Sequence, residues 1–86
     1  MKRIELDLSE VALRYELHLA LRNAFGFPEY YGMNLDALHD CLTDIREDTE
    51  ISIKGTENLI SSLGKYGEIA LKVIKISAEE NPHLLY

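Results

Sequence analysis

The chain has 86 residues, enough for one modest hydrophobic core, and we expect a single domain over residues 1–86. Fifteen Asp and Glu against nine Lys and Arg give a formal net charge of −6, which argues against nucleic-acid binding and suits a basic protein partner. A single cysteine, with no apolar leader and no membrane-spanning run in the sequence, is typical of a cytoplasmic protein.

The first third of the chain predicts a strand followed by a helix. Apolar and charged residues alternate over residues 3–8, which is the period of a half-buried strand. A helix is expected from an N-cap at Ser9 to about Ala24, with Gly26 as its C-terminal stop and Pro28 preventing its continuation. The apolar side of this helix is expected to be Leu13, Leu17, Ala20, Leu21 and Ala24.

The middle of the chain predicts a second helix and a second strand. Gly32 is expected to adopt a positive φ, and Asn34 is a favourable N-cap for a helix from about Leu35 to Arg46. A polar turn follows, and the alternation at residues 51–53 predicts a short strand. The apolar side of the helix is expected to be Leu35, Leu38, Leu42 and Ile45.

The last third predicts two more helices and a terminal strand. A short helix is expected over 57–63, a connector over 64–67, a last helix over 68–80 and a strand over 84–86. The last helix carries Ile69, Val73, Ile74 and Ser77 at helical spacing. Because strands separated by helical crossovers favour parallel pairing, we predict an α/β fold with a three-stranded parallel sheet packed with about four helices.

A row of carboxylates follows the central helix. Asp36, Asp40 and Asp44 recur every fourth residue, so they lie along one line, nearly opposite the leucines. Like charges at this spacing repel each other by a few tenths of a kcal/mol per pair. A solvated acidic surface is the simplest interpretation of such a row, and a face for a basic partner is the functional one.

The loop and helix over Pro28–Thr43 carry the most specific pattern in the chain. Three segments of this run resemble the barstar family of intracellular ribonuclease inhibitors: Pro28–Gly32, Asn34–Leu38 and Asp40–Thr43. Met33 and His39 depart from that pattern, because the family has a glutamate and a tryptophan there. The resemblance is looser over Glu16–His18 and Val73–Glu80.

This resemblance implies a barstar-like fold and a function without catalysis. It implies that the segment Tyr30 to Asp44 plugs the active site of a basic ribonuclease or nuclease toxin, as an immunity protein for a toxin made by the same cell. Asp40 matches the family's central phosphate mimic, and Asp36 matches the carboxylate that supports it. We also expect a chain that is monomeric when free, with no cofactor and no metal.

Further members of the expected partner-binding set follow from the same resemblance. Tyr30 matches a residue that stacks on the enzyme, while Asn34 and Thr43 match residues that add polar contacts. Ile76 stands where the family has a contacting glutamate, and Asp44, in place of a glycine, extends the acidic row. The set is completed by Gly32 and His39.

Two alternatives remain open from the sequence. One is a small metal-dependent hydrolase with Asp36, His39 and Asp40 as ligands, although no fourth ligand or general base is evident and His39 is expected to be an ordinary exposed histidine. The other is an acidic adaptor for a partner that is not a nuclease. Cys41 lies toward the apolar flank and is expected to be a buried hydrophobe, not a nucleophile. His18 is expected to be structural and to bond to the connection before the central helix.

Overall fold

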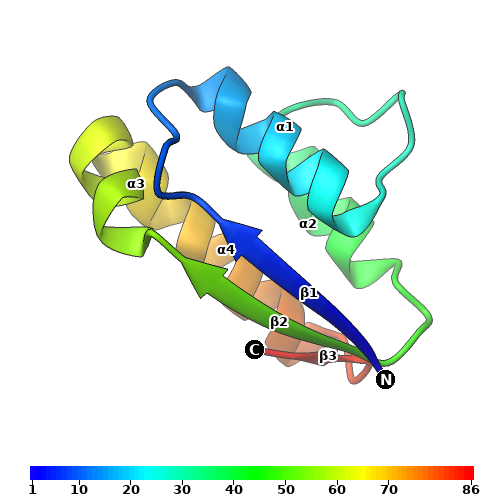
Figure 1. The fold of residues 1–86 in the computed structure, drawn as a ribbon. Coiled ribbons are helices and arrows are strands. Elements are labelled where there is room, and N and C mark those ends of the chain that lie inside the picture. Colours follow the sequence, from blue (N-terminus) through cyan, green and yellow to red (C-terminus); the bar gives the residue numbers. More distant parts are fainter.

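The computed structural model describes all 86 residues as three strands and four helices. The elements are β1 (Lys2–Asp7), α1 (Arg14–Phe25), α2 (Leu35–Thr43), β2 (Thr49–Lys54), α3 (Thr56–Leu63), α4 (Lys65–Glu80) and β3 (Leu84–Leu85) (Figure 1). The strands form one parallel sheet in the order β1-β2-β3. The predicted α/β fold with a three-stranded parallel sheet and four helices is therefore confirmed.

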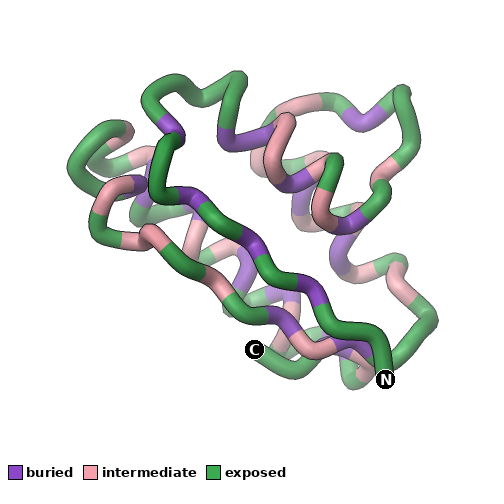
Figure 2. Tube along the Cα trace, viewed as in Figure 1, coloured by how far each residue is buried: buried purple, intermediate pink, exposed green.

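The sheet buries one face and leaves the other open. β1 pairs with β2 along its whole length, whereas β3 pairs only with the start of β2. Burial alternates along β1, where Ile4 and Leu6 point into the core and Arg3 and Glu5 point to solvent (Figure 2). The buried apolar core is formed by Ile4, Leu6, Leu8, Val11, Leu17, Leu21, Phe25, Tyr31, Leu38, Leu42, Ile51, Leu59, Ala70, Ile74 and Leu84. None of the helices is both long and apolar enough to cross a membrane.

The first helix begins later than its sequence pattern predicts. α1 starts at Arg14, and Ser9 is not its N-cap. The backbone N–H and the hydroxyl of Ser9 instead donate to Asp7, at 3.0 and 2.6 Å, and form a local turn after β1. Leu13, expected in the apolar side, is the exposed N-cap residue, and its N–H donates to the Glu16 carboxylate at 3.0 Å. Short-range polar bonds have displaced the helix start along the chain.

The ends of the other helices also differ from prediction. α2 ends at Thr43 rather than at Arg46, and α4 begins at Lys65, so the connector expected over residues 64–67 is reduced to Gly64. A Cβ on Gly67 would meet the Leu59 carbonyl oxygen at 2.8 Å, which shows how closely α4 packs on α3. The buried side of α4 accordingly includes three small residues beside one isoleucine, and Ile69 is exposed rather than buried. That side consists of Gly67, Ala70, Ile74 and Ser77.

A side chain from the end of α4 holds the C-terminal end of α2. The buried Asn81 side-chain amide donates to the carbonyl oxygens of Leu42, at 2.9 Å, and Ile45, at 3.0 Å. Carbonyls at a helix end have no partner within the helix, so an external donor is needed when they are buried. This contact fixes α2 against α4.

We expect Asn81→Ala to lower the free energy of unfolding by about 1–3 kcal/mol, because carbonyls in a buried setting lose their donor. Urea melts of the variant and the wild-type chain give the value. Asn81→Asp, which keeps the size but puts a carboxylate against the two carbonyls, should lose at least as much. The matched control is Asn23→Ala on the exposed side of α1, and equal midpoints for Asn81→Ala and Asn23→Ala would contradict the assigned role.

Candidate partner-binding face

α2 separates its charged side chains from the core. Leu38 and Leu42 are completely buried, while Asp36 and Asp40 are exposed on the other side. Asp44 is also exposed, as the C-cap residue just beyond the helix. The predicted opposition of leucines and aspartates is therefore confirmed, and the helix presents carboxylates from a backbone that the core holds in place.

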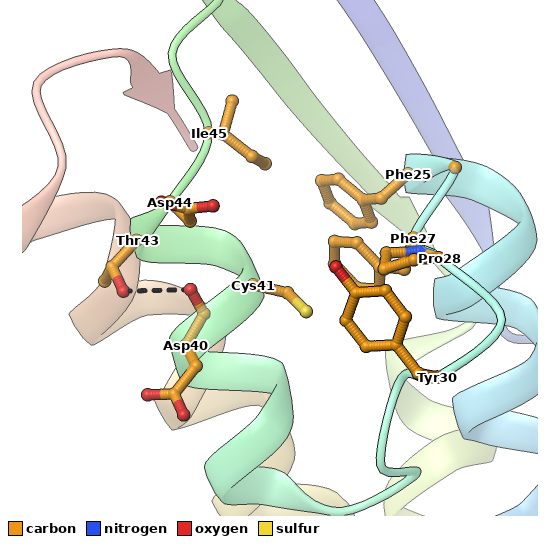
Figure 3. Close-up of a pocket in the computed structure, with 10 residues that line it drawn as sticks. Phe25, Phe27, Pro28, Tyr30, Asp40, Cys41, Thr43, Asp44 and Ile45 are labelled. Carbon is orange, nitrogen blue, oxygen red and sulfur yellow. Dashed lines mark hydrogen bonds between the residues drawn. The ribbon is translucent and has the colours of Figure 1, made fainter.

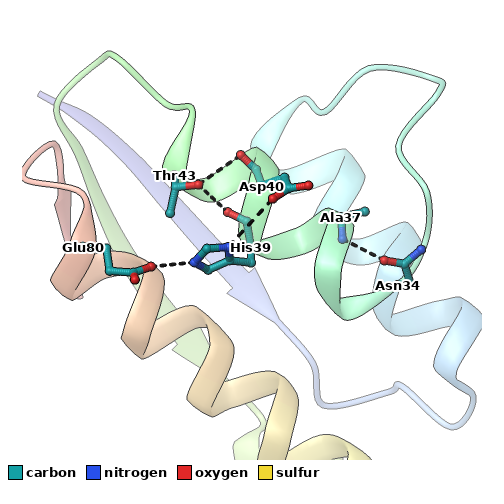
Figure 4. A network of polar contacts seen from close by, with 6 residues as sticks. All are labelled: Asn34, Ala37, His39, Asp40, Thr43 and Glu80. Carbon is teal, nitrogen blue, oxygen red and sulfur yellow. Dashed lines mark hydrogen bonds and ion pairs between the residues drawn. The ribbon is translucent and has the colours of Figure 1, made fainter.

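The start of α2 is fixed by Asn34. Its side-chain oxygen accepts the Ala37 N–H at 2.7 Å, as predicted for an N-cap (Figure 4), and its amide donates to the Gly32 carbonyl at 3.1 Å. The expected positive φ at Gly32 is wrong, since Met33 adopts it instead, with φ 55°. Space is tight at Gly32 instead: a Cβ there would lie 3.1 Å from the Asn34 amide nitrogen and 3.2 Å from the Ala37 Cβ.

Two adjacent tyrosines in the loop before α2 point in opposite directions. Tyr30 is 88% exposed, whereas Tyr31 is buried and its hydroxyl lies 2.7 Å from Nδ1 of His18. The other ring nitrogen of His18, Nε2, lies 2.7 Å from the Tyr66 hydroxyl. The predicted structural role of His18 is confirmed. The loop is anchored from inside, and Tyr30 is left free to contact another molecule.

The buried His18 predicts a pH dependence of stability. Burial lowers the pKa of His18 below its ordinary value of 6.5. Since the unfolded chain takes up this proton near pH 6.5 and the folded chain resists it, the stabilisation is complete above the unfolded pKa and is lost as the pH falls below it. Each pH unit between the folded and unfolded pKa values is worth about 1.4 kcal/mol.

We therefore expect the wild-type chain to lose more stability than His18→Gln as the pH is lowered from about 7 to about 5. Urea melts of both chains across this range measure the difference. The variant changes the stability at every pH by replacing the ring contacts, but it removes only one titrating group, so the acids that both chains share cancel in the pH dependence. Parallel curves would contradict the assignment.

A groove separates the Tyr30 loop from the acidic row. It has a volume of about 560 Å³, with Phe25, Phe27 and Tyr30 on one wall and Asp40 and Asp44 on the other (Figure 3). The Phe25 and Phe27 rings are stacked at 5.3 Å. No motif in the sequence identified either phenylalanine as part of the site.

Cys41 and Thr43 also line this groove. Cys41, predicted to be buried, is half-buried, and burial raises the pKa of its thiol. The Thr43 hydroxyl donates to the His39 carbonyl at 2.8 Å, so its oxygen is left with lone pairs that can accept a bond.

His39 connects α2 to the end of α4. Its Nε2 lies 2.5 Å from a Glu80 carboxylate oxygen, and its Nδ1 lies 3.9 Å from Asp40 (Figure 4). His39 is therefore not the ordinary exposed histidine that the sequence predicts. The hydrogen bond to Glu80 raises the pKa of His39. The stability that this bond adds to the folded chain is therefore complete below the unfolded pKa and is lost as the pH rises through the folded pKa. No local pattern indicates Glu80, because the contact depends on how α4 crosses α2.

The ligand set of the hydrolase alternative is not assembled. That alternative takes Asp36, His39 and Asp40 as ligands of a divalent ion. In the structure, no group of three or more His, Cys, Asp or Glu side chains is placed to hold a metal. The physical reason is that the His39 ring turns toward Glu80 on α4, where it has a carboxylate partner already.

Comparisons with known proteins cover nearly the whole chain. A sequence model of the family described as "Barstar (barnase inhibitor)" matches residues 1–83, which include the Tyr30 loop and all of α2. The Bacillus subtilis (strain 168) protein named "Putative ribonuclease inhibitor YrdF" is 37% identical over 81 residues. This alignment spans 93% of the chain and 89% of the relative.

Proposed function

The chain belongs to the barstar family, and from this premise we propose that it is a proteinaceous inhibitor of a basic ribonuclease and not an enzyme. The family description and the relative's name support ribonuclease inhibition. We propose further that the loop and helix from Tyr30 to Asp44 plug the nuclease active site, and that the chain serves as an immunity protein for a toxin of its own cell. The observation that carries this proposal is a row of exposed carboxylates on a helix whose opposite side is locked in the core.

The proposed mechanism is substitution of protein carboxylates for substrate phosphates. A ribonuclease active site uses Arg, Lys and His to hold the phosphate backbone. Carboxylates on a fixed helix can occupy the same positions and accept charge-assisted hydrogen bonds, which are shorter and stronger than neutral ones. Because the core and the Asn34 cap already order α2, little conformational entropy is lost on binding. Asp40 would take the central position, with Asp36 beside it.

The neighbouring residues would complete the contact. The exposed Tyr30 ring offers a flat surface for stacking on the enzyme. The Asn34 side chain accepts a hydrogen bond from Ala37, and the Thr43 hydroxyl donates one to His39. We propose that the remaining lone pairs of both side chains accept bonds from the nuclease. Asp44 extends the row, while Gly32 holds the loop close to the helix start.

The test is an inhibition assay against barnase and other basic ribonucleases, repeated at several salt concentrations. The wild-type chain should inhibit at least one of them, and its association rate should fall with salt, because opposed potentials raise such rates by about 10–10³-fold at low ionic strength. An inhibitor whose association rate is flat across the salt range would contradict the proposed role of the acidic row. Inhibition of none would overturn the proposed function.

A further inference from the structure

A second groove lies on the opposite flank of α2, along its contact with α4. It has a volume of about 620 Å³, an apolar floor and an edge formed by Asp36, His39 and Asp40. The floor is formed by Leu35, Ile69, Val73 and Ile76. Since the edge includes two carboxylates of the proposed binding face, this groove and that face are one continuous surface.

Two isoleucines in this groove are left unused by the core. Ile69 is 41% exposed and Ile76 is 43% exposed, about two helical turns apart on the same side of α4. A single exposed isoleucine is ordinary on a protein surface. Two that line one groove, with Asp36 and Asp40 along its α2 edge, form an apolar patch with charged groups beside it. An apolar centre with charged and polar groups beside it is the usual anatomy of a protein–protein contact.

We propose that this groove receives one apolar side chain of the partner ribonuclease, presented between basic residues that pair with Asp36 and Asp40. The proposal rests on the proposed function and specifies the chemistry of the partner's surface. Charge complementarity supports this proposal. The carboxylates of Asp36 and Asp40 attract cations at the edge, but a cation over the floor would lie against isoleucine and lose water without gaining a counter-ion. An apolar side chain of the partner, in contrast, buries the isoleucines and lets the partner's neighbouring basic residues reach Asp36 and Asp40.

The same argument makes Ile76 a specificity determinant. A nuclease that presents a cation over the exposed Ile76 side chain would leave that cation desolvated and unpaired, so a nuclease of that kind is disfavoured. The ribonuclease that fits this chain is therefore expected to carry an apolar residue opposite Ile76.

The experiment compares three isoleucines of similar exposure on helices. Ile69→Ser and Ile76→Ser remove the proposed anchor contacts, while Ile60→Ser on α3, where Ile60 is 40% exposed, is the matched control. The probe is whichever basic ribonuclease of the panel the wild-type chain inhibits most strongly. Each groove variant should raise the inhibition constant by at least about tenfold, and the control should leave it unchanged. Urea midpoints of all variants confirm that they remain folded.

Ile76→Glu gives the sharpest discrimination. Added negative charge would strengthen binding to a basic partner if the groove acted only through electrostatics. The apolar-anchor proposal expects weaker inhibition instead, with the salt dependence of association retained. Tighter inhibition by Ile76→Glu would overturn the inference, and so would groove variants with the same inhibition constant as Ile60→Ser. In either case the proposed function stands as long as the wild-type chain inhibits. A wild-type chain that inhibits no ribonuclease would overturn both.

Discussion

Asp40→Ala is expected to weaken inhibition more than any other single change in the acidic row, by about 2–5 kcal/mol of binding free energy. Asp40 lies between Asp36 and Asp44, so docking should remove it from water most completely. Truncating one member of a buried charge pair is costly mainly because the partner's charge is left unpaired. The quoted range already draws on a complex of this family.

The same change should hardly affect folding. In the free chain Asp40 is exposed, so its repulsion from other acids and its 3.9 Å contact with His39 are each worth only a few tenths of a kcal/mol. Inhibition constants and urea midpoints for Asp36→Ala, Asp40→Ala and Asp44→Ala should therefore separate, with binding losses largest for Asp40, smaller for Asp36 and smallest for Asp44. Glu5→Ala, an exposed acid on the open face of the sheet, is the control for lost charge alone. Equal inhibition by Asp40→Ala and Glu5→Ala would place the binding face elsewhere.

The sheet and the acidic row could be predicted because each depends on a short sequence period. Alternation over residues 3–8 and the helical crossovers between strands are enough to predict parallel pairing. The helical period alone places Asp36 and Asp40 opposite Leu38 and Leu42, and the structure confirms that placement. Asn34 was predictable as an N-cap for the same reason: its bond to Ala37 is local.

Features that depend on distant parts of the chain could not be predicted in this way. α4 extends back to Lys65 although it contains Gly67, because the missing side chain lets the helix pack against Leu59. Intrinsic propensity disfavours glycine in a helix, and tertiary packing has overridden it here. The predicted start of α1 was wrong for the opposite reason. Ser9 bonds to Asp7, only two residues away, and so does not cap the helix.

The candidate site shows the same division. Its carboxylates come from one helix and were identified from the sequence, but its borders come from the crossing of α2 and α4. The pair of His39 with Glu80 and the apolar groove beneath it exist only where those helices meet. For this reason His39 was expected to be free, and the exposure of Ile69 was not anticipated. The sequence could indicate which residues are acidic, but not which apolar surface accompanies them.

Leu38→Ala and Leu42→Ala are each expected to lower the free energy of unfolding by about 2–5 kcal/mol. Both side chains are completely buried on the side of α2 that faces the core, so truncation loses apolar burial and leaves a cavity. This is a large share of the roughly 5–15 kcal/mol that stabilises a typical small domain. Binding should be unchanged once inhibition is corrected for the folded fraction, because neither side chain reaches the acidic face.

The control for this pair is Leu13→Ala, a leucine that lies exposed at the start of α1 and should cost little stability. Urea melts of the three variants decide the outcome. If Leu38→Ala and Leu42→Ala both melt near the wild-type midpoint, then the side of α2 assigned to the core is wrong. The leucines and aspartates share one helical phase, so Asp40 could then no longer point outward, and the proposed inhibitory face would lose its geometric basis.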